Sequence, residues 1–394
     1  MAKRDRDSVG GITFPPRPEG IRIRMASSPA HRTVRRITAA LAASAAAALV
    51  LSACATGDTP APGGDGDAAS YGEISVQYSW IKNEEFAGEF YAYENGYYDE
   101  AGFSNVIGVS GPDTGVAKLL SGTVQVALSD AASVGAAVAE QDAPLKIIGA
   151  TFQKNPFTIL SLKDGADIAT PEDLIGKKIG VQDSNASVFQ AILNANGISP
   201  DQVTVVPVDF DPTPLMNGDV DGFMAYLTNE ALTVELAGYD ITNLPYADNG
   251  VPYVAETFTV TDQYLAENPE LIKAFLTAEI KGWTDVFTNS TDDSVALIEK
   301  YYNKAAADNA DGLESVFGAL DPVKTGKGLE AEKELISTAD TEANGLFTIT
   351  DELKAQTVAS LAAAGWEVSV DELFDTTIID EIYAENPELK AYLP

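Results

Sequence analysis

The chain has 394 residues, of which 45% are apolar, so it is long enough to bury one large core or two domains. It contains a single cysteine, Cys54, and a single histidine, His31, which excludes a disulfide framework and cysteine-based metal sites. Its formal net charge of −34 disfavours binding to nucleic acid, so we predict no nucleic-acid partner.

An alanine-rich apolar run at 37–51 follows Arg35 and Arg36 and ends in Leu-Ser-Ala-Cys at Cys54. Its fifteen residues fall short of the ~20 that a membrane-spanning helix needs. The pattern is typical of a bacterial lipoprotein signal. We therefore expect residues 1–53 to be removed, Cys54 to carry a lipid, and the protein to be extracytoplasmic and lipid-anchored to the outer face of the cell membrane.

The part of the chain that follows this leader has a more extreme composition than the whole. From Cys54 onward there are 16 lysines, no arginine, no histidine and 56 acidic residues, which gives a formal charge of −40. Without an imidazole, Ser-His-Asp or Cys-His catalysis and histidine-containing zinc sites are excluded. We predict no catalytic residues, no metal and no cofactor. Residues 54–71 are small and polar, which predicts a flexible tether.

Strands and helices alternate along the next part of the chain. The strands are predicted at 74–80, 105–109, 124–128, 145–151 and 158–162, and the helices at 86–98, 113–120 and 131–140. Such alternation is typical of parallel sheets flanked by helices, in a doubly wound α/β fold. Ligands of these folds bind beyond the carboxyl ends of the strands.

A second unit of the same kind begins at Thr170-Pro171, a helix start with proline at its first position. It contains predicted strands at 179–181, 203–207 and 222–225 and a helix at 187–195. After a strand at 253–260, the sequence predicts helices at 269–287, 293–304 and 351–365.

Several short motifs occur in a characteristic order. They are Trp80 at the end of the first strand, Phe86-Ala87-Gly88, the segments 94–98 (ENGYY) and 119–127 (LLSGTVQVA), Thr170 to Leu174 (TPEDL), 176–178 (GKK) and 216–222 (MNGDVDG). Each is weak alone, but their joint order over about 72–289 resembles the SsuA/NMT1-like solute-binding family. Members of that family bind thiamine-precursor pyrimidines, riboflavin, aliphatic sulfonates or nitrate.

The resemblance implies a two-lobed, periplasmic-binding-protein-like (type II) α/β fold with two crossover strands, at 158–162 and 253–260, and a helical C-terminal segment. Lobe 1 is expected to comprise 72–166 and 253–394, and lobe 2 to comprise 167–252. The lobes would close on a small-molecule ligand, and the closed form would be recognised by an ABC permease of the cytoplasmic membrane. We expect a monomer.

The residue types narrow the choice of ligand. Sulfonate and nitrate sites favour arginine, which is absent after the leader, so anions are less favoured. Trp80 stands where the family stacks an aromatic ligand, although a core tryptophan under the first helix is the alternative. Asn229 and Glu230 match a segment that accepts hydrogen bonds from ring amino groups, or they simply begin a helix.

Relatives that bind pyrimidine precursors often carry histidine where this chain has Phe86, which leaves the ligand's identity open. Asp130 either faces the cleft or caps the next helix. The acidic pairs Glu84/Glu85 and Asp292/Asp293 are interpreted as solvated first-turn acids rather than as a glycosidase pair. The predicted ligand-binding residues are Trp80, Asn83, Phe86, Asp130, Gln153, Asn155, Asn185, Tyr226, Asn229 and Glu230.

The function predicted from the sequence is that of a solute-binding lipoprotein for a small aromatic heterocycle, such as a thiamine-precursor pyrimidine. The alternatives are riboflavin, an aliphatic sulfonate such as taurine, or nitrate as the ligand, and a sensory role in place of transport. Fungal relatives that make the thiamine pyrimidine use an active-site histidine. Because His31 lies in the leader, we predict that this chain is not an enzyme.

Overall fold

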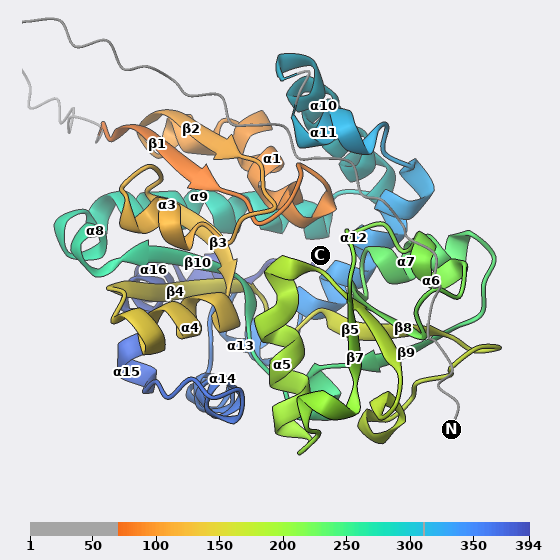
Figure 1. The fold of residues 1–394 in the computed structure, drawn as a ribbon. Coiled ribbons are helices and arrows are strands. Elements are labelled where there is room, and N and C mark those ends of the chain that lie inside the picture. The colour runs from red at the N-terminus through yellow and green to blue at the C-terminus, as the bar shows by residue number, and fades with distance from the viewer. Residues whose placement is uncertain (1–69, 310–311) are drawn as a thin grey trace, which may run out of the picture. The chain divides into compact units, whose positions relative to one another are not determined.

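The computed structural model describes residues 70–309 and 312–394, and these belong to one compact unit. They form two five-stranded sheets surrounded by helices (Figure 1). The predicted two-lobed α/β class with a helical C-terminal segment is therefore confirmed. The leader, Cys54 and most of the tether lie outside the described residues.

The first sheet has the strand order β2-β1-β3-β10-β4. Strands β1 and β2 are parallel, as are β1 and β3, whereas β10 runs antiparallel to both of its neighbours. The interior of the sheet is apolar, with Val76 and Phe258 buried. Its strands are β1 (Gly72–Gln77), β2 (Phe103–Val109), β3 (Val126–Asp130), β4 (Leu145–Phe152) and β10 (Ala255–Thr261).

The second sheet has the order β7-β6-β8-β5-β9, and β5 runs antiparallel to both of its neighbours. Strand β6 is parallel to β7 and to β8. Its strands are β5 (Phe157–Leu162), β6 (Lys178–Val181), β7 (Thr204–Pro207), β8 (Gly222–Tyr226) and β9 (Ile241–Pro245).

The sheets are mixed rather than parallel throughout, because each contains one reversed strand, and these two strands, β5 and β10, are the predicted crossover strands. Strand β4 ends where the two lobes meet. The chain therefore enters the second sheet from that side, and β5 runs opposite to its neighbours. Strand β10 enters the first sheet in the same way after β9. The crossings are therefore the segments 153–156 and 246–254, and β5 belongs to the second sheet although 158–162 was expected in lobe 1.

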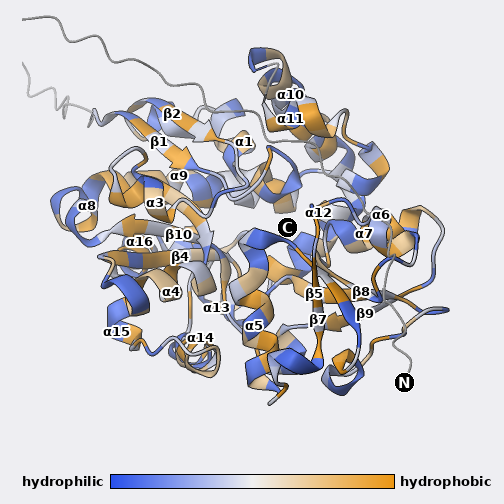
Figure 2. Cartoon of the chain, viewed as in Figure 1, coloured by the Kyte–Doolittle hydropathy of each residue, from blue (hydrophilic) through white to orange (hydrophobic). Residues whose placement is uncertain are grey.

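The helices cover both sheets and carry mixed polar and apolar residues, whereas apolar residues dominate many of the strands (Figure 2). The helices before β10 are α1 (Ala87–Glu94), α2 (Tyr97–Glu100), α3 (Val116–Leu120), α4 (Ala131–Gln141), α5 (Ala186–Ala195), α6 (Thr213–Met216) and α7 (Glu230–Leu236). Those after it are α8 (Asp262–Glu267), α9 (Pro269–Thr288), α10 (Thr291–Asp308), α11 (Leu313–Phe317), α12 (Pro322–Ile336), α13 (Ala339–Asn344), α14 (Asp351–Ala363), α15 (Val370–Leu373) and α16 (Thr377–Glu385).

Short 3-10 helices complete the fold. They are η1 (Glu84–Phe86), η2 (Pro171–Leu174), η3 (Asp183–Asn185), η4 (Pro200–Gln202), η5 (Ala247–Asn249) and η6 (Pro387–Lys390). The helix predicted at 86–98 is divided into η1, α1 and α2. Gly96 ends the middle part with a left-handed φ of 73°, a conformation that favours glycine.

Helices α1 and α9 cross at two glycines. A Cβ at Gly88 would lie 2.1 Å from Cδ1 of Trp283, and one at Gly282 would lie 2.1 Å from the carbonyl oxygen of Gly88. Only glycine at both positions lets the two helices approach this closely, which anchors η1 against the first lobe.

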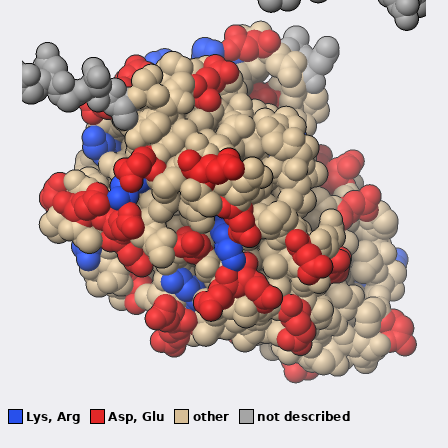
Figure 3. All heavy atoms as spheres, turned by 90° about the vertical axis from the view of Figure 1, so that its left-hand side faces the viewer, with Lys and Arg blue, Asp and Glu red and all other residues tan. Residues whose placement is uncertain are grey.

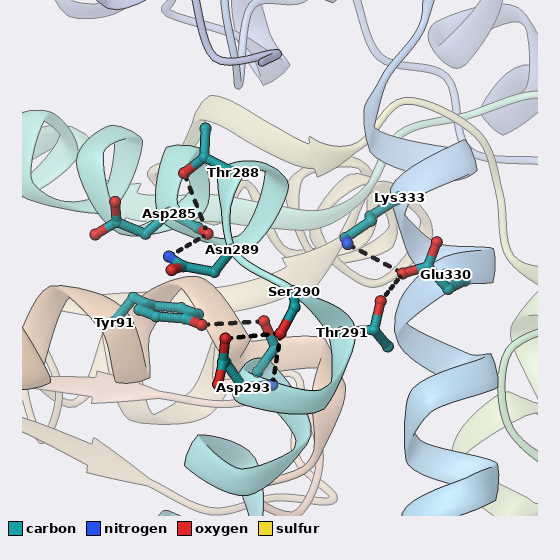
Figure 4. Close-up of polar contacts among 10 residues, drawn as sticks. Tyr91, Asp285, Thr288, Asn289, Ser290, Thr291, Asp293, Glu330 and Lys333 are labelled. Carbon is teal, nitrogen blue, oxygen red and sulfur yellow. Dashed lines mark hydrogen bonds and ion pairs between the residues drawn. The ribbon is translucent and has the colours of Figure 1, made fainter.

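The C-terminal helices are tied to the first lobe by polar contacts (Figure 4). The hydroxyl groups of Tyr91 and Ser294 lie 3.1 Å apart, which joins α1 to α10. The hydroxyl of Thr291 donates to Glu330, which also pairs with Lys333 at 3.1 Å, so α10 and α12 are joined as well.

The same helices reach the second lobe. Helix α12 packs against α7 as well as β4, and α14 packs against both α4 and α5. The C-terminal segment thus contacts both lobes, whereas the sequence assigned it to lobe 1 alone. Helix packing between segments distant in sequence carries no local signal.

Acidic side chains are spread over the face drawn in Figure 3, with few lysines among them. In the parts of the chain that the structure describes, no helix has both the length and the apolar character required to span a membrane.

Candidate functional site

A cavity of about 110 Å³ lies where the two sheets face each other. It is built from the carboxyl ends of β3 and β8, the segments that follow β1 and β6, and the first residues of the reversed strands β5 and β10. All these ends meet at one place because of the crossover topology described above. This is the predicted ligand position for such sheets. The lining includes aromatic, amide, hydroxyl and carboxylate side chains from both lobes.

Glu256 has the most constrained backbone among the acids that line the cavity. It lies at an irregularity in β10, between Ala255 and Thr257, where the register with β3 shifts. Its φ of 45° is a left-handed value that a glutamate rarely adopts. A bulge of this kind turns a side chain out of the regular strand alternation and into a site. Ser79 donates to both carboxylate oxygens, at 2.8 and 2.9 Å, and burial raises the pKa of Glu256 to about 8.

Glu85 also lines the cavity, and Glu84 lies next to it in η1. Both side chains are only 3% exposed, so the interpretation of this pair as solvated first-turn acids is wrong. Helix α12 covers them, and a Cβ at Gly328 would lie 2.4 Å from Oε1 of Glu84. Burial raises the pKa of Glu84 to about 7 and that of Glu85 well above its usual range. Asp292 and Asp293, in contrast, are exposed.

Two further acids of the first lobe line the cavity and have close partners. Asp130 caps α4 by accepting from the backbone N–H and the hydroxyl of Ser133, at 2.8 and 2.7 Å. The capping alternative for Asp130 is therefore correct, and its side chain lines the cavity as well. Asp113 forms an ion pair with Lys118 at 3.0 Å.

Aromatic rings form part of the wall. The ring of Trp80 lies 4.5 Å from that of Phe210, which belongs to the second lobe, and 5.3 Å from that of Phe317, which ends α11. Trp80 is thus in contact with two distant parts of the chain, and it is also buried in the hydrophobic core that contains Phe86 and Phe90. On the other side, Phe157 packs edge-on against Tyr226, with 4.5 Å between the ring centroids.

The second lobe contributes mainly amide and apolar groups. Gln182 donates to the carbonyl oxygen of Met224 at 3.0 Å and accepts from Asn185 at 3.0 Å. Glu230, the one acid from this lobe that lines the cavity, accepts from the backbone N–H of Tyr226 at 2.8 Å. Burial raises the pKa of Glu230.

Asn229 and Glu230 begin α7, so the helix-start interpretation is correct, while hydrogen bonding of this segment to a ligand stays a prediction. Asn229 also accepts a hydrogen bond from Lys324 of α12, which links the C-terminal segment to the second lobe.

Six of the ten predicted ligand-binding residues line the cavity: Trp80, Asp130, Asn185, Tyr226, Asn229 and Glu230. The other four lie outside it. Asn83 is buried beside Glu85, with 3.4 Å between Nδ2 and Oε1. Phe86 is buried and stacks on Tyr78, with their ring centroids 4.4 Å apart.

Gln153 and Asn155 belong to the first crossing. Gln153 donates to the carbonyl oxygen of Ala150 at 2.8 Å. Asn155 donates to the carbonyl oxygen of Val251 at 3.0 Å and accepts from the backbone N–H of Phe157 at 2.9 Å. It therefore joins the two crossings to each other and does not line the cavity.

Sequence reasoning missed several residues that line the cavity, chiefly Ser79, Glu85, Ser129, Phe157, Gln182, Phe210 and Glu256. Phe157 is the first residue of β5 and Gln182 directly follows β6, so their positions at strand ends could have indicated them. Nothing in the local sequence marks Glu256, because its orientation depends on a bulge. In residues 70–309 and 312–394 no group of acidic, histidine or cysteine side chains is arranged to hold a metal ion.

Comparison with known proteins places this geometry in context. Residues 83–292 match the NMT1/THI5-like family. The riboflavin-binding protein RibY of Chloroflexus aurantiacus is 27% identical over 232 residues, which are 55% of this chain and 63% of RibY. The chain thus spans less than two thirds of the length of this curated relative.

Two solved structures have the same fold at low sequence identity. A protein from Bordetella bronchiseptica has a TM-score of 0.61 at 14% identity, and the match covers 80% of this chain and 98% of that one. The periplasmic aliphatic sulphonate-binding protein SsuA of Escherichia coli has a TM-score of 0.55 at 14% identity, covering 82% and 96%. The crossed two-lobed fold and the match over more than half of its residues place this chain in the NMT1/THI5-like family.

Proposed function

We propose that this protein is the solute-binding component of an ABC importer and that it binds a small aromatic heterocycle between its two lobes. The observation that carries the proposal is the cavity at the meeting point of the strand ends, which both lobes line. A ligand there contacts both lobes and so favours the closed form. Closure, rather than a chemical step, would be the signal to a permease.

The cavity's dimensions and its lining favour a single-ring ligand. A volume of about 110 Å³ is of the order of the ~150 Å³ engineered cavity that admits benzene. Trp80, Phe210 and Tyr226 supply flat apolar surface for stacking. The carboxylates of Glu85, Glu230 and Glu256 can accept hydrogen bonds from amino or ring N–H groups. These features suit a thiamine-precursor pyrimidine.

Riboflavin is the second candidate, because the curated relative RibY binds it. Its three fused rings need more room than the cavity offers, so the lobes would have to bind it in a more open arrangement. Sulfonate and nitrate are less favoured, since acids line the cavity and the chain has no arginine after the leader. A sensory role would use the same binding event without transport.

We propose further that the protein is a monomer, held at the outer face of the membrane by a lipid on Cys54. The tether of 54–71 would let the folded body reach the permease. We propose no catalytic role, because the only histidine of the chain lies in the leader.

The first experiment is a thermal-shift screen of the chain from residue 54 onward, with Cys54→Ser to leave out the lipid. The panel contains thiamine-precursor pyrimidines, thiamine, riboflavin, taurine, alkanesulfonates and nitrate. A ligand at a hundredfold its Kd adds ~2.7 kcal/mol to the free energy of unfolding. We expect the shift with a pyrimidine and its loss in Trp80→Ala. A shift with sulfonate or nitrate alone would contradict the aromatic ligand.

A further inference from the structure

The acids that line the cavity lack counter-ions. Apart from Asp113, none of them takes part in an ion pair formed among the described residues. None of the described residues that line the cavity is a lysine, an arginine or a histidine. The wall therefore contains several carboxyl groups that are buried without a matching positive charge, so ionising them is costly unless a ligand supplies that charge.

A second group shows where a partner is missing. Ser129, near the end of β3, lines the cavity and is 1% exposed. Its hydroxyl has no hydrogen-bond partner among residues 70–309 and 312–394. Buried hydroxyls normally have a partner, so this one marks a position at which a ligand atom completes the wall. Ser129 precedes Asp130 and pairs across the sheet with Thr257, which follows Glu256.

Aromatic rings form another part of the lining. Trp80, Phe157, Phe210 and Tyr226 all line the same cavity. The faces of aromatic rings attract cations, more strongly when water is excluded. Aromatic faces combined with unpaired carboxylates favour an organic cation over an anion or an uncharged molecule.

We propose that the ligand of this cavity carries a positive charge, as an ammonium or a protonated ring nitrogen attached to an aromatic ring, and that Glu85 and Glu256 are its counter-ions. This inference rests on the proposed function and adds the ligand's charge to it. The bulge that orients Glu256 then has a purpose, because it aims a carboxylate at the ligand at the expense of backbone strain.

Proton release is a consequence of this pairing. The groups that face Glu256 are the donor Ser79, the acids Asp130, Glu85 and Glu89, and Tyr226. None of them is a base. Without a ligand, burial keeps the pKa of Glu256 at about 8, so this carboxyl is mostly protonated at neutral pH. A bound cation favours the ionised form, so binding releases a proton to solvent.

Glu85 is surrounded in the same way. Asn83 donates weakly to it, while Glu84, Glu230 and Glu256 raise its pKa, and Glu332 of α12 lies near this group. The positive charge of Lys324 in α12 partly offsets the rise in the pKa of Glu84 and Glu230, and Lys324 donates a hydrogen bond to Asn229. Glu85 and Glu256 are thus surrounded mainly by other acidic groups, and a bound cation would reduce the repulsion among them.

The test uses three probes that share one ring and differ in charge: benzylamine, benzyl alcohol and benzoate. Binding to the chain from residue 54 onward with Cys54→Ser is measured by calorimetry in two buffers of different ionisation enthalpy, between pH 6 and pH 7.5. We expect benzylamine to bind about tenfold or more tightly than benzyl alcohol, and benzoate not to bind. The benzylamine affinity should rise with pH, by up to about tenfold per pH unit for one released proton.

Variants assign the effect to particular carboxyls. Glu256→Gln and Glu85→Gln preserve shape and should each lower the benzylamine affinity about tenfold and reduce the proton release. Asp292→Asn is the control, because Asp292 is an exposed acid at the start of α10 and does not line this cavity. It should change the affinity less than about twofold. Thermal melting of each variant checks that it folds, and if one does not, the other carries the test.

The outcomes separate this inference from the proposed function. If a thiamine-precursor pyrimidine binds but benzylamine does not, or if benzyl alcohol binds as tightly as benzylamine without proton release, the inference is overturned and the proposed function stands. If neither the pyrimidines nor the benzyl probes bind, both are overturned.

Discussion

The two walls of the cavity differ in their chemistry. The first lobe contributes Glu85, Asp130 and Glu256, and buried glutamates lie behind them, whereas the second lobe contributes amide and apolar side chains with Glu230 as its single acid. The first wall therefore sets the charge of the site, and the second supplies surface that closes over the ligand. Each wall is built from the carboxyl ends of parallel strands and the start of one reversed strand. The difference therefore lies in the residues and not in the architecture.

The largest expected effect comes from the ring that spans both walls. Trp80→Ala removes contacts with Phe210 and Phe317 and should lower the free energy of unfolding by about 3–5 kcal/mol. Phe210→Ala, on the second wall, should cost only about 1 kcal/mol, because its side chain is partly exposed. Urea unfolding at one pH measures both. Equal losses would show that Trp80 does not connect the lobes as described.

The acidity of the first wall makes stability depend on pH. The pKa values of Glu84 and Glu256 are raised to about 7 and about 8, above their values in the unfolded chain. The stability that these two carboxyl groups contribute when protonated is then fully present below about pH 4, and it is lost as the pH rises through 7 and 8. From pH 5.5 to pH 8.5 the free energy of unfolding should fall by on the order of 3 kcal/mol, as measured by urea titrations.

A variant behind the same wall sharpens this prediction. Burial raises the pKa of Glu332 well above its usual range, and both of its carboxylate oxygens lack a partner among the described side chains. Glu332→Gln should therefore stabilise the protein above pH 8 and flatten the pH profile. Asp292→Asn, at an exposed helix start, is the control and should leave the profile unchanged. Stability that rises from pH 5.5 to pH 8.5 would contradict the assignment.

A smaller effect is expected at the connection between the walls. Asn155→Ala removes two buried hydrogen bonds, one to Val251 in the other crossing and one to the backbone N–H of Phe157 at the start of β5, and should cost about 1–3 kcal/mol. If Asn155 contributes to closure, the association rate of a bound ligand should also change, which stopped-flow fluorescence of Trp80 can measure. A loss of stability with unchanged kinetics would limit Asn155 to a packing role.

The smallest effect is expected at the contact of the C-terminal segment with the second wall. Lys324→Met removes the hydrogen bond to Asn229 and should change the free energy of unfolding by less than about 1 kcal/mol, since one partner is a flexible lysine. It should also raise the pKa of Glu84 further, because Lys324 holds that pKa down. The pH profile of unfolding, compared with that of the unchanged chain, reports this shift.

The sequence by itself determined the fold class and much of the element order. Alternating apolar residues and helix starts such as Thr170-Pro171 are local signals, so most predicted strands and helices lie within a few residues of their predicted ends. Two of the six predicted cavity residues follow from the same signals, since Asp130 comes after a predicted strand and Asn185 before a predicted helix. The other four, Trp80, Tyr226, Asn229 and Glu230, came from the family resemblance. The family resemblance added the two-lobed arrangement, which no local pattern contains.

The tertiary structure decided the reversed strands, the contacts of the C-terminal helices with both lobes and the chemistry of the first wall. Glu84 and Glu85 look like exposed helix-start acids until α12, more than two hundred residues later, covers them. Glu256 lies in an ordinary strand sequence, and only the bulge against β3 turns it into the cavity. Burial and side-chain direction depend on neighbours that are distant in the chain, and that is why a single sequence does not contain them.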